Sequence, residues 1–136
     1  MNALDTAIYS KLSKDPDLVA DVGSNIFNME VPQGTTASKY IIFSRQGGPG
    51  DENICPRRLK NYVYQVQAIS KVSLKAAGTT DDLVDACLHN QTLSVTGWGC
   101  FWMARESDVR YIEAGPGGEP YYHAGGLYRV RLYKSS

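Results

Sequence analysis

Few residues in this 136-residue chain have the types and spacings that enzymes or metal sites use. Cys55, Cys87 and Cys100 are odd in number and form no C-x-x-C pair, so we expect reduced thiols, while metal or disulfide use stays the alternative. His123 lacks a serine, cysteine or carboxylate nearby in the sequence, which leaves a catalytic triad unsupported. The pattern favours a protein without enzymatic activity and without a cofactor.

Four acidic residues could also do chemistry, as two pairs. Asp51 and Glu52 are adjacent in a glycine-rich segment, where side chains are held too loosely for paired acid–base catalysis. That segment, Gly47–Gly50, is no phosphate-binding loop, because no Gly-Lys-Ser/Thr sequence follows it. Asp81 and Asp85 lie one turn apart on a predicted helix, and we expect them on one exposed face. Because no further ligand follows at a useful spacing, they predict a solvated helix start rather than a metal site.

A compact basic cluster is the third feature with a possible function. Arg57, Arg58 and Lys60 are close together, and Arg45 precedes them across a predicted loop, Gln46–Lys60. Long loops between strands are commonly functional or disordered. The cluster is therefore either a solvated loop tip or an arm that docks on an acidic neighbour.

The overall charge limits the classes of partner. Lys+Arg and Asp+Glu number 14 each, so the formal net charge is +0. Nucleic-acid binders need clustered Lys and Arg to displace counterions, and acidic membranes attract similar clusters, so both classes are disfavoured. Self-association meets little electrostatic barrier. The N-terminus shows no signal-peptide pattern, and no apolar run approaches the roughly 18 residues that span a bilayer.

One stretch organises the predicted fold. Asn61–Ser70 is rich in aromatic and β-branched residues and contains no Gly or Pro, which predicts a covered strand rather than a helix. One face of this strand carries Gln65 and Gln67, and should be wetter or covered by a polar surface. The apolar face should meet a helical layer, and it consists of Tyr62, Tyr64, Val66 and Ala68.

Two short helices are predicted at the N-terminus. Apolar residues recur at helical spacing over residues 2–12. Asp15 then suits the N-cap of a second helix, Pro16 its first position and Gly23 its C-terminal stop. We expect both helices to serve packing alone.

A longer helix is predicted over Val72–Asn90. Gly78 would cost about 1 kcal/mol inside it, so we expect a new N-cap at Thr79 or Thr80. Three acidic residues would then complement the positive end of the helix dipole: Asp81, Asp82 and Asp85.

Further strands are predicted on both sides of Asn61–Ser70. Residues 26–28 and 40–45 precede it, and the second of these is apolar enough for burial on both faces. In the last strand, Arg129 and Arg131 lie on the outer face, where they meet either solvent or acidic groups of a partner. The strands after the long helix are predicted at residues 93–105, 110–113 and 127–133.

These elements predict one α+β domain over residues 1–136. We expect an antiparallel β-sheet of about four to six strands, two main helices packed on one face, and a long loop between the second and third strands.

The order of these segments resembles the tail-completion or tail-terminator proteins of long-tailed bacteriophages and related prophage particles. The resemblance covers nearly the whole chain and depends on an ordered set of motifs rather than on one sharp signature. The motifs are Ile26-Phe27-Asn28, Val31-Pro32-Gln33-Gly34, Tyr40-Ile41-Ile42-Phe43-Ser44, Tyr64-Gln65-Val66-Gln67-Ala68, Leu88-His89-Asn90, Tyr121-Tyr122-His123 and Tyr128-Arg129-Val130.

The resemblance implies a non-catalytic virion protein that is assembled in the host cytoplasm. Such a subunit forms a homohexameric ring at the head-proximal end of the tail tube, stops polymerisation of the tube protein and joins the tail to the head-side connector. DNA would only pass through the lumen of the ring. A connector or neck protein is the nearest alternative, and a small-molecule-binding domain is a more distant one.

Opposite charge clusters in a neutral chain suggest how the subunits meet. We expect the basic loop to reach the acidic helix start of a neighbouring copy, or else to lie against the tail tube. The expected interface residues are Arg45, Arg57, Arg58, Lys60, Asp81, Asp82, Asp85, Arg129 and Arg131.

Overall fold

The computed structural model describes residues 2–32, 34, 36–52 and 59–134. Five strands form one sheet in the order β1-β2-β3-β5-β4. β1 pairs with β2 in parallel, and the other neighbours are antiparallel. No helix in the described part is long and apolar enough to cross a membrane. The elements are α1 (Asn2–Ser13), α2 (Pro16–Val22), β1 (Ile26–Asn28), β2 (Lys39–Glu52), β3 (Leu59–Ser70), α3 (Leu74–Leu88), β4 (Trp98–Ala114) and β5 (Pro120–Lys134).

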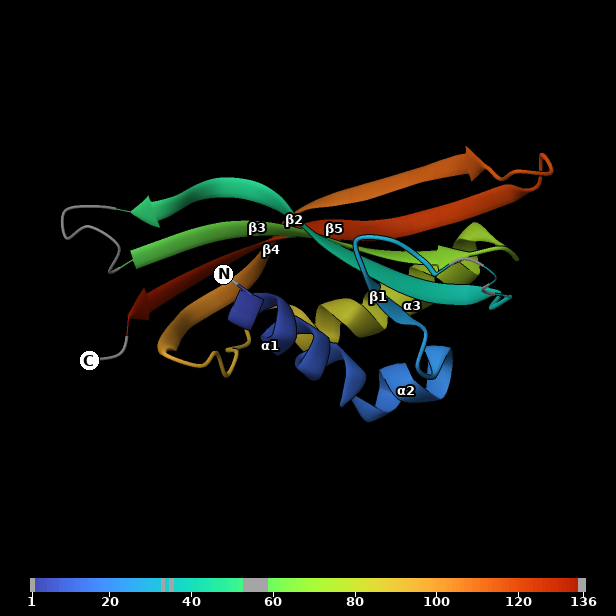
Figure 1. Cartoon of the computed structure of the whole chain (residues 1–136). Helices are drawn as coiled ribbons and strands as arrows, with labels where there is room; N and C mark the ends of the chain where they lie inside the picture. The colour runs from blue at the N-terminus through green and yellow to red at the C-terminus, as the bar shows by residue number, and fades with distance from the viewer. Residues whose placement is uncertain (1, 33, 35, 53–58, 135–136) are drawn as a thin grey trace.

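The helices all lie on one face of the sheet, and no element among the described residues forms a layer on the other face (Figure 1). This arrangement confirms the predicted α+β class, with five strands and helices on one side. The core fills the space between the two layers. Its fully buried members include Leu4, Ile8, Leu18, Tyr64, Val84, Leu88, Val130 and Leu132.

β3 is the central strand of the sheet. Its helix-facing side chains are buried as predicted, but Gln67 and Ile69 on the face predicted to be wetter are buried too. Tyr64, Val66 and Ala68 are buried against the helical layer. Gln65 is half-buried on the opposite face, which no helix covers. Ile42 of β2 is only half-buried, although burial on both faces was predicted there.

The predicted boundaries of the short helix α2 are confirmed. The Asp15 carboxylate accepts hydrogen bonds from the backbone N–H of Asp17 at 3.0 Å and of Leu18 at 3.2 Å. Pro16 occupies the first turn, where its missing N–H costs nothing. Gly23 ends the helix with φ +63°, a conformation that favours glycine.

The predicted new start of α3 at Thr79 or Thr80 is wrong. The helix begins at Leu74 and continues through Gly78, and Ser73 is its N-cap. The Ser73 hydroxyl accepts a hydrogen bond from the Ala76 N–H at 3.1 Å. A Cβ on Gly78 would lie 3.3 Å from Nη2 of the exposed Arg110 side chain on β4.

The predicted loop Gln46–Lys60 is largely strand. β2 continues to Glu52 and pairs with β3, whose first residue is Leu59. Register shifts around Gly47 absorb extra residues of β2, because glycine tolerates its φ of +136°. Cys55, Arg57 and Arg58 lie outside the described residues.

The C-terminal strands are also longer than predicted. One strand, β4, replaces the two separate strands predicted at 93–105 and 110–113. A register shift between Arg105 and Ser107 lets β4 continue through the polar residues at its middle. β5 likewise begins at Pro120 rather than at Leu127.

Candidate functional site: the buried arginine, the open face and the sheet edges

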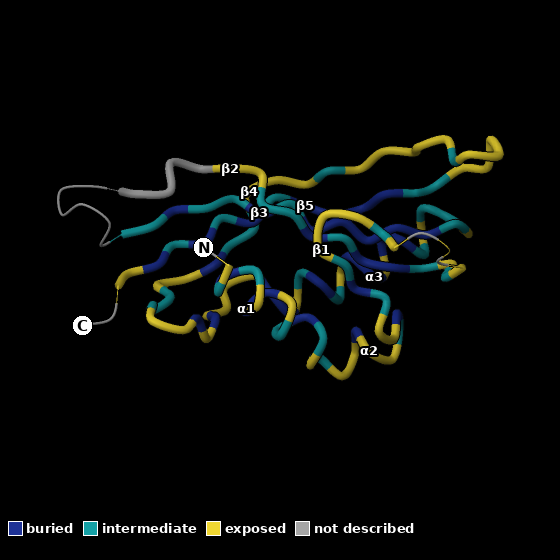
Figure 2. The backbone as a smooth tube through the Cα atoms, in the orientation of Figure 1, coloured by how far each residue is buried: buried dark blue, intermediate teal, exposed yellow. Residues whose placement is uncertain are grey.

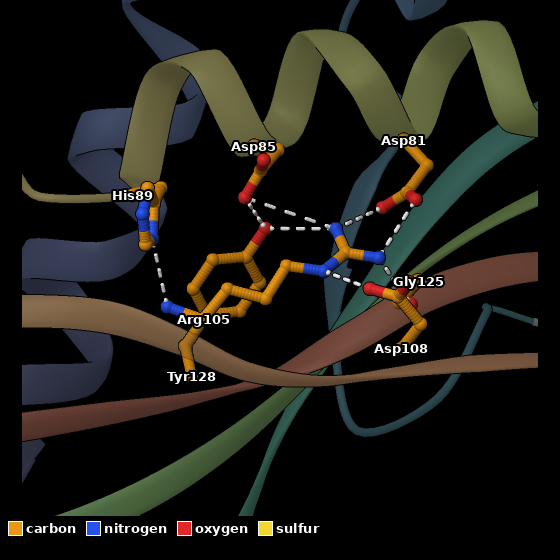
Figure 3. A network of polar contacts seen from close by, with 7 residues as sticks. All are labelled: Asp81, Asp85, His89, Arg105, Asp108, Gly125 and Tyr128. Atoms are coloured by element: carbon orange, nitrogen blue, oxygen red, sulfur yellow. Dashed lines mark hydrogen bonds and ion pairs between the residues drawn. The ribbon is translucent and has the colours of Figure 1, made fainter.

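A buried arginine holds α3 onto the sheet (Figure 3). Nη1 of Arg105 lies 2.8 Å from one oxygen of Asp81, and Nη2 lies 2.9 Å from the other. The same guanidinium donates to the Gly125 carbonyl at 2.6 Å and, through Nε, to Asp108 at 2.8 Å. Tyr128 joins the cluster, since its hydroxyl accepts from Arg105 at 3.2 Å.

The electrostatics of this cluster keep Arg105 charged and Tyr128 protonated. Burial by itself would lower the pKa of Arg105, but the bonds to Asp81 and Tyr128 outweigh it and raise that pKa. Burial also raises the pKa of Tyr128, which keeps the phenol protonated and able to donate to Asp85 at 3.1 Å. The cluster is therefore a fixed structural tie rather than a proton-transfer site.

The sequence predicted that Asp81 and Asp85 share an exposed face of α3, and this prediction is wrong. Asp81 is 4% exposed and is bound to Arg105 of the same chain. Asp85 is half-buried, and Figure 3 shows it pointing toward Tyr128. Only Asp82 is exposed. The sequence pattern missed Arg105 because the partner lies on a strand distant along the chain.

The predicted basic interface residues also have contacts within the chain. Arg45 donates to Asp5 and to the Tyr64 hydroxyl, each at 3.2 Å, and stacks on Tyr62. These contacts tie β2 to α1 and β3. Arg45 is therefore half-buried.

The outer-face arginines of β5 likewise meet groups of their own subunit. Arg129 pairs with Glu106 on β4 and donates to Asn61 on β3 at 2.7 Å. Arg131 lies over the ring of Trp102 at 5.8 Å, and Lys60 over the ring of Trp98 at 5.9 Å. The expected choice between solvent and a partner's carboxylate thus omitted a third case, which is pairing across neighbouring strands.

The uncovered face of the sheet contains a groove of about 250 Å³. Gln67 of β3 is 5% exposed, yet neither Nε2 nor Oε1 of its amide has a hydrogen-bond partner among the described residues. His123 of β5 lines the same groove, stacked on Tyr111 at 4.2 Å between ring centroids. Its Nε2 lies 3.4 Å from Glu113, and its Nδ1 has no partner in the described part of the chain.

Two adjacent glycines, Gly125 and Gly126, leave room for the side chains of Gln67 and Arg105. A Cβ on Gly125 would lie 2.2 Å from the Val66 carbonyl and 3.0 Å from the Gln67 amide carbon, so Gln67 packs where a side chain would stand. A Cβ on Gly126 would lie 2.5 Å from Nε of Arg105. The Gly125-Gly126 pair was the one sequence signal that pointed to these sites, because paired glycines in a strand mark a close approach of other groups.

Two strand edges remain open, on opposite sides of the sheet. β1 covers β2 only at Ile41–Phe43, so the outer edge of β2 beyond Phe43 has no partner strand in the described chain. Residues 89–91 cover the outer edge of β4 near Met103 and Arg105. Beyond that point, residues 106–114 of β4 have no outer partner strand among the described residues, and most of this segment is exposed (Figure 2).

The described cysteines show no sign of chemical activation. Cys87 and Cys100 are free thiols, and burial raises the pKa of Cys87 to about 12. Within the described ranges, no three His, Cys, Asp or Glu side chains are grouped as they would be around a metal ion.

A sequence model of the family described as tail completion protein gp17 matches residues 6–121, which is most of the chain and includes both open edges. The chain belongs to this tail-completion family. The resemblance drawn from the ordered motifs is thereby confirmed. As a family member, the chain is a structural component of bacteriophage-type tails.

Solved structures share the fold of this tail-completion protein at low sequence identity. One is a chain from the virion of a native gene transfer agent particle, with a TM-score of 0.79 and 16% identity, covering 97% of this chain and 96% of that one. A second, which carries no functional name, has a TM-score of 0.67 and 12% identity, covering 99% and 97%. The comparison with curated protein sequences found no match.

Proposed function

We propose that this tail-completion protein assembles into a closed homohexameric ring at the head-proximal end of the tail tube. There it stops polymerisation of the tube protein and presents a surface to the head-side connector. Family membership supports the position in the tail, and the likeness to a chain of a gene transfer agent virion agrees with it. Assembly in the host cytoplasm, with DNA passing only through the lumen, completes the proposal.

The open edges on opposite sides of the sheet are the observation that carries the ring. Unpaired strand edges invite pairing with another chain, and soluble monomers usually block them. Here residues 106–114 of β4 leave one edge open, and Ile112 beside it is 60% exposed. Because the second open edge belongs to a different strand, β2, the two patches form a head-to-tail contact, which closes into a ring when the rotation allows.

Charge would contribute to the same contact. We retain Arg57, Arg58 and Lys60 as the basic side of the interface, with Asp82 as the exposed acid of the neighbouring α3. We no longer include Asp81 in the proposed interface, because it is already paired with Arg105 of the same chain. Charge reversal of Arg57 and Arg58 to Glu separates this contact from docking on the tube: in the first case the ring loosens, and in the second the ring persists but no longer stops tube growth.

The mass of the purified chain, measured by light scattering over a range of concentrations, tests the ring. We expect a hexamer, and we expect Ile112→Lys to lower the mass toward the monomer by placing a charge on the open edge. Val72→Lys is the matched control, because Val72 is 68% exposed and lies in the connection between β3 and α3 rather than in an edge strand. A hexamer that caps no tube but binds the head-side connector alone would instead assign the chain to the neck.

A further inference from the structure

We propose that the groove around Gln67 receives the Gly115–Glu119 turn of a neighbouring copy. This inference rests on the proposed ring and names one of its contacts. It explains why a primary amide is buried in the subunit without partners.

The groove is chemically incomplete in a single subunit. Gln67 offers two N–H donors and a carbonyl acceptor, and it is 5% exposed with neither atom paired among the described residues. Buried polar groups nearly always have partners, because an unpaired one costs about 1–3 kcal/mol. Both amide atoms are covered in the single subunit, so a partner that enters the groove on assembly reaches them when the Gln67 side chain turns toward it.

The unpaired groups define the chemistry of that partner. Gln67 needs an acceptor and a donor close together, and His123 adds an acceptor at Nδ1 when its Nε2 donates to Glu113. A peptide group carries one donor and one acceptor, whereas a phosphate or a metal ion satisfies only one of these needs. The other lining side chains are uncharged: Met29, Ile42, Ser44, Gln65, Ile69 and Tyr111. An uncharged stretch of polypeptide is the fitting occupant.

The turn between β4 and β5 has the required properties. It projects beyond the helical layer at the end of the sheet, so it is available to another copy (Figure 1). Its first four residues, Gly115–Gly118, are uncharged and carry no long side chain. The carboxylate of Glu119 folds back over the turn, since a Cβ on Gly115 would lie 2.7 Å from it and a Cβ on Gly117 2.6 Å. Residues 116–120 are all exposed. Within the turn, the Gly118 N–H bonds to the Gly115 carbonyl at 2.9 Å.

The size of the groove also favours a narrow turn. A volume of about 250 Å³ is far too small for a helix, whose diameter with side chains is about 10 Å. It suffices for a few residues with little or no side chain. The projecting turn and the groove occupy different places on one chain, as a head-to-tail ring requires.

Replacement of the amide is the first test. Gln67→Leu keeps the size of the side chain and removes every hydrogen bond, so we expect ring dissociation at a concentration at least tenfold higher than for the unchanged chain. The melting temperature of the dissociated subunit should stay equal or rise, because an unpaired buried amide is lost. Gln91→Leu, at an exposed position on the helical side, is the control and should assemble normally.

Disulfide trapping between copies is the second test. In a background of Cys55→Ser, Cys87→Ala and Cys100→Ala, one protein carries Ser44→Cys in the groove and another carries Gly117→Cys in the turn. Mixing the two under oxidation should give linked dimers that neither protein forms alone. Thr96→Cys, placed on an exposed loop away from the groove, should not link to Gly117→Cys.

The outcomes separate this inference from the function on which it depends. Linked dimers together with weakened Gln67→Leu rings support the turn-in-groove contact. Rings that form normally without the link, and that Gln67→Leu leaves intact, would overturn the contact and leave the ring standing. If the chain is monomeric alone, the same trapping is done in assembled tails, where a single copy per tail would remove both proposals.

Discussion

Arg105 fixes the position of α3 through one buried ion pair. Two nitrogens of its guanidinium donate to the two carboxylate oxygens of Asp81, and one of them also donates to a backbone carbonyl of β5. Such two-pronged pairing orients both partners and is stronger than a single contact. The cluster therefore acts on the subunit's stability, and through it on the helical layer that covers the core.

Replacement of Arg105 by Met tests this role. We expect a loss of about 3–5 kcal/mol in the free energy of unfolding, because the variant leaves Asp81 buried and unpaired. Urea unfolding measures the loss. Lys at the same position should recover only part of it, since an ammonium group cannot bind both carboxylate oxygens in the same plane. A Met variant as stable as the unchanged chain would show that the pair is dispensable.

His123 gives the groove a pH dependence. Burial lowers the pKa of His123 below its ordinary value of 6.5, while the contact with Glu113 raises it by less. The neutral imidazole is thus favoured in the folded state, and the unfolded chain takes up the proton first as the pH falls. Its contribution to stability is complete above about pH 6.5 and is lost as the pH drops below that value.

The difference between the unchanged chain and His123→Asn isolates this contribution. Below pH 6.5 the unfolding free energy of the unchanged chain should fall more steeply, by up to about 1.4 kcal/mol per pH unit, than that of the variant. Urea unfolding at several pH values gives both slopes. Parallel slopes would mean that His123 has the same pKa folded and unfolded, against the effect of its burial.

At the scale of elements, β5 depends on two glycines for its fit against β3 and β4. Gly125 leaves room for the Val66 carbonyl and for the amide of Gln67, while Gly126 leaves room for Arg105. A side chain at either position would push strands apart. The groove and the arginine cluster therefore share one structural cause, on opposite faces of the same strand.

Gly125→Ala should destabilise the subunit by about 3 kcal/mol, because the new Cβ would lie 2.2 Å from a backbone carbonyl that cannot move away cheaply. Gly117→Ala provides the comparison. There the nearest atom, at 2.6 Å, belongs to the flexible end of Glu119, so the change should stay within about 0.5 kcal/mol. Thermal unfolding of both variants as dissociated subunits measures the difference. Equal effects would contradict the close packing assigned to Gly125.

Local sequence patterns predicted which helices and strands form better than they predicted how long each one is. The buried helix-facing side of β3 and the cap at Asp15 depend on near neighbours in sequence, and both are confirmed. The length of β4 and the course of α3 through Gly78 depend on contacts with other elements, which the sequence order does not display. The acidic residue Asp81 was assigned to the surface for the same reason, because its partner Arg105 is remote in sequence.

At the scale of the whole molecule, the subunit has a covered face, an open face and two open edges. The covered face provides the core, and Figure 2 shows how exposure concentrates along the outer half of β4. The edges and the groove offer hydrogen-bonding groups in places where a neighbouring chain can use them. These features fit a protein that completes its structure by assembly, and the family is one of tail proteins.

Imaging tails that are made without this protein measures the proposed ending of the tube most directly. Electron micrographs should show tubes of variable length, many longer than normal and without heads, and supply of the intact chain should restore uniform tails joined to heads. Tails of normal length, attached to heads in the absence of the protein, would contradict the account.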